Sequence, residues 1–183
     1  ILKESYYTRD HTERMISYFK NESICVRGKN IEINPSQFTG CNIDVPGDAS
    51  KASFLIALTC LWNKSDLTIR ECSINQYRLG FVSILKKMGA EIYVDKRRIR
   101  CGEIVGDIHV KYSSQLKNVH ITSKEVRDMI DEIPILSIIA SLSIGVMSIN
   151  GISELKIKES NRVFAIISNL KKMGCDIREN NNS

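Results

Sequence analysis

The sequence predicts a mixed α/β fold that is built from a repeated β-α-β-α-β-β unit. Short alternating strands are interspersed with two kinds of helix, one apolar on nearly all sides and one amphipathic. The segment Leu-Lys-Lys-Met-Gly-Ala-Glu-Ile at 85–92 recurs as Leu-Lys-Lys-Met-Gly-Cys-Asp-Ile at 170–177. Upstream of each copy lie an apolar helix, a short strand and an amphipathic helix in the same order, which indicates an internal repeat.

Residues 1–44 are expected to precede a domain boundary, and 8–33 resemble the tail of an earlier, degenerate copy of the repeat. A short leader ends in a turn at 8–10 that precedes a helix through Phe19, and strand-like pieces follow around 24–26 and 31–33. The loop at 35–40 and the Pro-Gly-Asp sequence at 46–48 indicate a crossing into a new unit. We therefore place a domain boundary near residue 44.

Residues 45–183 are expected to hold two copies of the repeat. The predicted elements are, in order, an apolar helix at 49–62, a strand at 67–69, an amphipathic helix at 75–88, strands at 91–94, 99–101 and 108–110, and a buried helix then a strand within 135–149. Pro134 is compatible with that second apolar helix only in its first turn.

Composition excludes several classes of protein. With 43% hydrophobic residues in 183, the chain can bury a core, but its longest apolar run is interrupted by serines and is shorter than the roughly 20 residues that span a bilayer. The six cysteines are far apart without a Cys-x-x-Cys pair, and no secretion signal opens the chain, so we expect a cytoplasmic protein with reduced thiols. We expect no membrane partner.

The charge pattern favours a small anionic ligand over nucleic acid. The net charge of +5 is moderate, and the basic residues are scattered without interleaved aromatic residues. A small polyanionic substrate requires only a few of these cations.

The segment at 156–162 concentrates charge at a helix start. Leu155 and Ile157 alternate with charged residues as at the end of a strand, and helical spacing begins at Val163, with Ser160 as the predicted N-cap. Lys158, Glu159 and Arg162 would then surround one space in front of unpaired backbone N–H groups, which suits an anion that also exchanges a proton. The alternative to an anion site is an ordinary solvent-exposed helix start, in which Glu159 and Arg162 form an ion pair with each other.

An arginine recurs at the start of the second helix of each unit. Arg9, Arg78 and Arg162 stand ten or eleven positions before the residues that end these amphipathic helices, Phe19, Met88 and Met173. A guanidinium at a helix start can bind phosphate or carboxylate oxygens, although surface arginines inherited with the repeat would give the same pattern.

Five motifs in order along the chain resemble the enolpyruvyl transferases, in particular those of the shikimate pathway. They are Thr-Arg-Asp-His-Thr-Glu at 8–13, Pro-Gly-Asp-Ala-Ser at 46–50, Asn-Gln-Tyr-Arg-Leu-Gly at 75–80, Met-Ile-Asp-Glu-Ile-Pro at 129–134 and Lys-Glu-Ser-Asn-Arg at 158–162. The resemblance implies an inside-out α/β prism with helices in its core, in which 1–44 end the first, substrate-binding domain and 45–183 supply two units of the second. It also implies that the chain is an internal fragment without several ligands of phosphoenolpyruvate, and that this fragment alone is inactive.

The same resemblance implies a reaction and assigns roles to five residues. The enolpyruvyl group of phosphoenolpyruvate would pass to the 5-hydroxyl of shikimate 3-phosphate with release of phosphate. Asp131 would bind the ring hydroxyl and act as base, Glu159 would protonate the methylene carbon, and Lys158 would neutralise the reacting centre. Arg162 would hold phosphoenolpyruvate, and Arg9 would contact shikimate 3-phosphate.

Some assignments stay open at this point. Which of the three proton-handling residues moves which proton is undecided, and Asp131 could equally be a helix N-cap. Asn161 stands where the family usually has aspartate, and Lys51 where serine is usual. No cofactor and no metal are implied, and His11 is assigned to a helix-start motif while the other two histidines are assigned to the surface.

Three further expectations concern partners and competing functions. The complete protein would be a monomer. A related acceptor, UDP-N-acetylglucosamine, remains an alternative, as does a non-catalytic polyanion-binding domain, which would not explain carboxylates at the matching helix starts.

Overall fold

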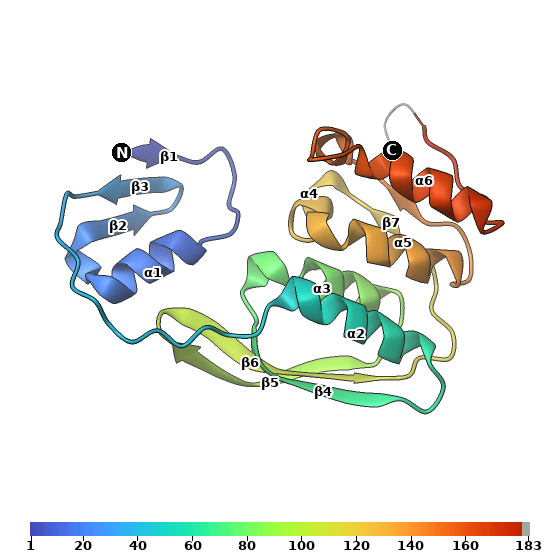
Figure 1. The fold of residues 1–183 in the computed structure, drawn as a ribbon, viewed down its shortest axis with the longest axis horizontal. Coiled ribbons are helices and arrows are strands. Elements are labelled where there is room, and N and C mark those ends of the chain that lie inside the picture. The colour runs from blue at the N-terminus through green and yellow to red at the C-terminus, as the bar shows by residue number, and fades with distance from the viewer. Residues whose placement is uncertain (181–183) are drawn as a thin grey trace.

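The structure is a computed structural model that describes residues 1–180. Its N-terminal part is a small antiparallel sheet of strand order β1-β3-β2, with helix α1 beside it (Figure 1). The elements are β1 (Leu2–Lys3), α1 (His11–Phe19), β2 (Ile24–Arg27) and β3 (Asn30–Ile33). The β2–β3 turn passes through Gly28 at a φ of 62°, which glycine adopts without a steric cost. The turn, the helix and both strands predicted within residues 8–33 are confirmed.

A segment without helix or strand, residues 34–46, leads to the second part of the chain. There the larger antiparallel sheet has the strand order β4-β6-β5. Its strands are β4 (Asp66–Ser73), β5 (Ile92–Arg100) and β6 (Glu103–Lys111).

The prediction of three strands between 91 and 110 was wrong. Residues 92–100 form one strand, β5, whose register with β6 shifts between Asp95 and Arg98. The charged run at this irregularity breaks the apolar alternation, so one strand with a bulge resembles two short strands in the sequence.

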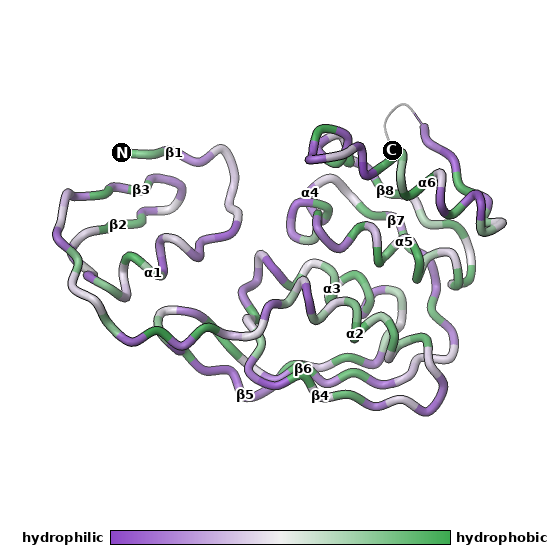
Figure 2. Tube along the Cα trace, in the orientation of Figure 1, coloured by the Kyte–Doolittle hydropathy of each residue, from purple (hydrophilic) through white to green (hydrophobic). Residues whose placement is uncertain are grey.

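Two helices, α2 (Ala49–Leu61) and α3 (Gly80–Lys87), cover one face of this sheet (Figure 1). Helices α4 (Ser123–Arg127), α5 (Ile133–Ser141) and α6 (Arg162–Lys172) lie on the other side of α2 and α3, away from the sheet (Figure 1). Helix α2 contacts both the sheet and α5, and green, hydrophobic residues gather along α2, α3 and α5 in Figure 2. The core includes Ile56, Leu85, Ile108 and Leu136, each at most 1% exposed.

The two predicted apolar helices are confirmed as α2 and α5, with Pro134 in the first turn of α5. For each of these helices, the segment before the helix pairs in parallel with a segment after it. Gly47 bridges Cys72 across α2, and β7 (His120–Ile121) pairs with β8 (Ser148–Ile149) across α5. The order apolar helix, strand, amphipathic helix is thus present twice, as α2-β4-α3 and α5-β8-α6.

Two predicted elements differ from the structure. The helix expected at 75–88 begins only at Gly80, because a 3-10 helix, Gln76–Arg78, precedes it and the Asn75 side chain accepts a hydrogen bond from the Tyr77 N–H at 3.0 Å. The strand expected before residue 158 is a 3-10 helix, Ser153–Lys156. Leu155 is buried there whereas Ile157 is 81% exposed, so these two residues do not share a buried strand face. Within residues 1–180, no helix combines the length and apolar character that crossing a membrane requires.

Candidate active site

Asp131 is the centre of a cluster of charged side chains that come from distant parts of the chain. It lies in a 3-10 helix, Ile130–Glu132, immediately before α5. The N-cap of α5 is Glu132, and no side chain caps that helix start. Asp131 therefore does not cap α5, and its carboxylate points to two arginines instead.

Arg9 and Arg162 both contact this carboxylate. Arg9 Nη2 donates a hydrogen bond to Asp131 Oδ2 at 2.9 Å, and Arg162 Nη1 lies 3.6 Å from Oδ1. Arg9 stands just before α1, and Arg162 is the first residue of α6. The Arg9, Asp131 and Arg162 side chains are 30%, 35% and 26% exposed, so all three are half-buried and still accessible.

The electrostatic environment keeps Asp131 ionised. Burial by itself raises the pKa of its carboxyl group, but the hydrogen bond from Arg9 and the charges of Arg9, Arg162 and Lys158 outweigh that effect. The resulting pKa lies below the ordinary value of 3.8. At neutral pH this group is a carboxylate that can accept a proton or a hydrogen bond from a hydroxyl group.

Glu159 and Lys158 lie beside this centre, in the loop before α6. Glu159 Oε1 accepts a hydrogen bond from Arg162 at 2.5 Å, which lowers the pKa of this exposed carboxyl group. Lys158 Nζ donates to Glu154 at 2.7 Å, four residues earlier. The structure thus links Arg9, Asp131, Arg162 and Glu159 into one chain of contacts, whereas Lys158 acts on Asp131 through its charge.

The cap of α6 differs from the prediction. Asn161, not Ser160, is the N-cap residue, and its Oδ1 accepts a hydrogen bond from the Phe164 N–H at 3.0 Å. Asparagine and aspartate cap helices about equally well, so the departure from the family pattern at this position preserves the helix start that carries Arg162. Lys51, the other departure, is exposed on α2.

Arg78, the remaining arginine of the repeat, has a structural role in this structure. Its Nη2 donates to Asp48 Oδ1 at 2.6 Å and to Ser50 Oγ at 2.8 Å, which ties the 3-10 helix before α3 to the start of α2. Close by, burial raises the pKa of Glu132, although a hydrogen bond with Ser50 and the charge of Arg78 act in the opposite direction. Arg78 is therefore not part of the Asp131 cluster.

Sequence reasoning missed the residues that fix Arg9 against the second part of the chain. Asn75 Nδ2 donates to Asp10 Oδ1 at 2.6 Å, and His11 Nδ1 lies 2.6 Å from Glu103 Oε1. Asp10 also accepts from Arg14 Nε at 2.8 Å. The Asn75–Asp10 and His11–Glu103 pairs are 65 and 92 residues apart in sequence, so no local pattern predicts them.

His109, which was assigned to the surface, is only partly exposed. Its ring stacks on Tyr93 with centroids 4.4 Å apart, and its side chain is 16% exposed. Its possible ligand atoms lie within 4.8 Å of those of Asp95 and Asp107, a grouping that could hold a metal ion. However, His109 Nε2 contacts Asp95 at 3.0 Å and Lys96 Nζ contacts Asp107 at 3.0 Å, so both carboxylates already have a partner.

A groove of about 450 Å³ adjoins the cluster between α5 and α6. Arg162 and Glu159 contribute to its wall, and most of the other lining residues, such as Ile138, Ile166 and Met173, are apolar. The charged cluster therefore stands at the rim of an apolar surface.

Comparisons with known proteins show the family of this chain. The family model described as EPSP synthase (3-phosphoshikimate 1-carboxyvinyltransferase) matches residues 1–183. The 3-phosphoshikimate 1-carboxyvinyltransferase of Persephonella marina is 39% identical over 179 residues, which are 96% of this chain and 41% of that protein. The protein of the same name from Petrotoga mobilis is 42% identical over 180 residues, covering 94% of this chain and 40% of that protein.

A solved structure gives the same result for the fold. The EPSP synthase of Acinetobacter baumannii superposes with a TM-score of 0.90 at 36% identity, over 99% of this chain and 41% of that chain. The predicted mixed α/β fold of the enolpyruvyl transferase type is thereby confirmed, and this chain spans about two fifths of the length of its relatives. Because the family match extends over every residue, the chain belongs to the EPSP synthase family.

Proposed function

We propose that the complete protein containing this chain transfers the enolpyruvyl group of phosphoenolpyruvate to the 5-hydroxyl of shikimate 3-phosphate and releases phosphate. The observation that carries this proposal is the position of Asp131 between Arg9 and Arg162. A carboxylate base between two guanidinium groups suits a reaction in which a hydroxyl group attacks a substrate that carries a phosphate and a carboxylate.

The charges at the site match the charges of such substrates. Arg9, Arg162 and Lys158 contribute three positive charges, against two negative charges from Asp131 and Glu159. Each arginine has five N–H donors, so an arginine that contacts Asp131 can still bind a phosphate or carboxylate. Arg9 is assigned to shikimate 3-phosphate and Arg162 to phosphoenolpyruvate.

The residues divide the proton transfers between them. Asp131 binds the ring hydroxyl and accepts its proton as the oxygen attacks C2 of phosphoenolpyruvate. Glu159, which is ionised in the free site and must first take up a proton, gives that proton to the methylene carbon. Lys158 neutralises charge at the reacting centre. The addition intermediate then loses phosphate, and a proton leaves its new methyl group. These two losses restore the double bond of the enolpyruvyl group.

The remaining expectations are part of the same proposal. Residues 1–44 end the first, substrate-binding domain, and residues 45–183 belong to the second. The partners are the two small-molecule substrates, without nucleic acid or membrane, and the complete protein is a cytoplasmic monomer that uses no cofactor. The isolated chain, which lacks part of the site, is expected to show no turnover.

The test is phosphate release by the complete protein with each acceptor in turn. The relatives named 3-phosphoshikimate 1-carboxyvinyltransferase support shikimate 3-phosphate as the acceptor. Release that requires shikimate 3-phosphate is the expected result. Release only with UDP-N-acetylglucosamine, or with neither acceptor, would overturn the proposal.

A further inference from the structure

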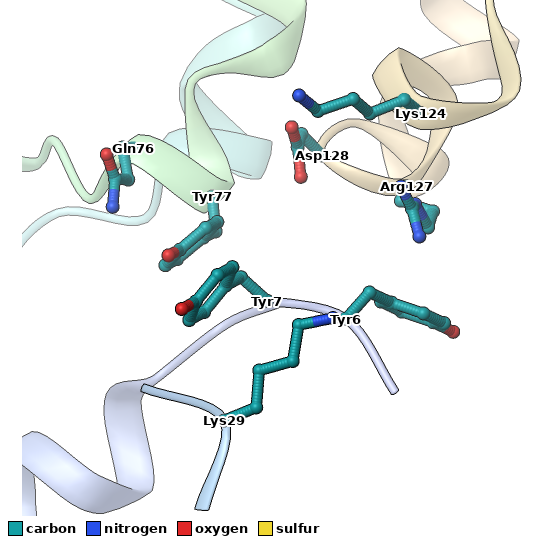
Figure 3. Close-up of a pocket in the computed structure, with 8 residues that line it drawn as sticks. All are labelled: Tyr6, Tyr7, Lys29, Gln76, Tyr77, Lys124, Arg127 and Asp128. Carbon is teal, nitrogen blue, oxygen red and sulfur yellow. The ribbon is translucent and has the colours of Figure 1, made fainter. Parts of the chain in front are cut away.

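A second cavity, of about 320 Å³, lies apart from the apolar groove beside α6. Figure 3 shows its walls, which come from three places: the segment before α1, the β2–β3 turn, and the region around α4 and the 3-10 helix before α3. This volume is at the lower end of the range for small-molecule sites. The cavity is therefore large enough for one ring-sized ligand.

The wall is strongly basic. Lys29, Lys124 and Arg127 face a single carboxylate, Asp128, whose pKa burial raises. Lys29 Nζ already donates to the Ser5 carbonyl at 2.6 Å. Among residues 1–180, by contrast, the side chains of Lys124 and Arg127 form no hydrogen bond or ion pair with another residue. Both cations act on Asp128 through their charges, and their N–H groups can donate to a ligand.

The rest of the wall is aromatic. Tyr6, Tyr7 and Tyr77 line the cavity (Figure 3). Arg127 lies 4.3 Å from the centre of the Tyr6 ring. Tyrosine rings offer flat apolar faces that favour another ring, whereas a lysine and an arginine favour an anion.

We propose that this cavity is a second binding site, separate from the Asp131 cluster, for a small anion that carries an aromatic ring, such as an aromatic carboxylate. The carboxylate would bind Lys124 and Arg127, and the ring would lie against Tyr7 and Tyr77. This site does not depend on the proposed function.

The cavity and the Asp131 cluster draw on the same two stretches of the chain. Tyr7 is two residues before Arg9, and Asp128 is three residues before Asp131. A ligand that contacts Tyr7 therefore lies beside the segment that presents Arg9.

The test uses chemical-shift titration of the isotope-labelled chain with 4-hydroxybenzoate as the probe. We expect saturable shifts at Lys124, Arg127 and Tyr77. Benzyl alcohol keeps the ring without the charge, and cyclohexanecarboxylate keeps the charge without the aromatic face, so both should bind more weakly. No saturable shift, or equal binding of either analogue, would overturn the proposal.

Matched variants separate this site from the candidate active site. The double variant Lys124→Gln/Arg127→Gln should weaken probe binding about tenfold or more, because it removes two charge-assisted contacts. Lys171→Gln, an exposed lysine on α6, should leave it unchanged. Tyr77→Leu provides an independent test at the aromatic wall and should also weaken binding.

Arg9→Gln distinguishes the two proposals. It should reduce binding of shikimate 3-phosphate to the complete protein and leave the probe's contact with Lys124 and Arg127 intact. Probe binding that is lost in Arg9→Gln and retained in the double variant would place the probe at the Asp131 cluster and overturn the second site.

Discussion

Arg9 Nη2 and Asp131 Oδ2 are 2.9 Å apart although 122 residues separate them in sequence. The contact joins the turn before α1 to the 3-10 helix before α5, and Arg162 approaches the same carboxylate from the start of α6. Three helix starts thus meet at one carboxyl group. The charge state of Asp131 depends on both arginines.

Arg9→Gln should raise the pKa of Asp131, because the hydrogen bond and charge of Arg9 now oppose the effect of burial. The titration of the Asp131 carboxyl carbon by NMR measures the shift. Arg70→Gln, at an exposed arginine, is the control, and an unchanged Asp131 titration in Arg9→Gln would contradict the electrostatic account.

Acid stability should depend on Glu125. Its hydrogen bond with Lys87 and the capping box with Thr122 lower its pKa from 4.5 to about 2. A carboxyl group with a lowered folded-state pKa contributes stability above pH 4.5 and loses that contribution as the pH falls towards 2.

Glu125→Gln should therefore reduce the free energy of unfolding at neutral pH by about 1 kcal/mol, through the loss of the charged cap. It should also flatten the acid limb of the stability curve. Urea denaturation at a series of pH values measures both effects, and parallel curves for the two proteins would show that Glu125 is not the group responsible.

Gly102 should be intolerant of a side chain. It has a φ of 82°, and a Cβ atom there would lie 2.7 Å from the Arg14 carbonyl oxygen of α1. Gly102→Ala should destabilise the chain by about 1–3 kcal/mol, because the β5–β6 hairpin must move away from α1. Thermal unfolding measures the loss, and Gly40→Ala, where a Cβ meets no atom within 4 Å, is the control.

The helix start that carries Arg162 depends on its cap. Asn161→Ala should cost about 1 kcal/mol of unfolding free energy, whereas Asn161→Asp should be nearly neutral because aspartate accepts the same hydrogen bond from Phe164 N–H. Urea denaturation of both variants provides the comparison. Equal losses in the two variants would indicate that the side-chain cap does not stabilise α6.

The sequence predicted those parts of the fold that depend on local pattern. Helices α2 and α5 are apolar on most sides. Helix α2 was placed within one residue of its observed bounds, and the start of α5 was placed within two residues. The repeat of residues 85–92 at 170–177 predicted the recurring order of elements around α3 and α6. Where a tertiary contact decides a boundary, the pattern failed. The helix at α3 starts at Gly80, which packs against the Asp128 backbone, and not at residue 75.

The sequence predicted which residues belong to the candidate site, but it did not predict which of them contact one another. Arg9, Asp131 and Arg162 were chosen because they stand in motifs at helix starts, and the structure brings them together. The same reasoning included Arg78 among the possible anion ligands, yet its guanidinium binds Asp48 and Ser50. Nothing in the local sequence distinguishes an arginine that faces a ligand from one that joins two helix starts.

The most direct test of the central claim is phosphate release from phosphoenolpyruvate and shikimate 3-phosphate by the complete protein and its Asp131→Asn variant. The substitution preserves size and removes the base, so we expect a loss of about 10²–10⁴ in kcat. Asp176→Asn, at an exposed carboxylate near the end of the chain, should retain full activity. If Asp131→Asn releases phosphate as fast as the unaltered protein, Asp131 is not the base and the proposed site is wrong.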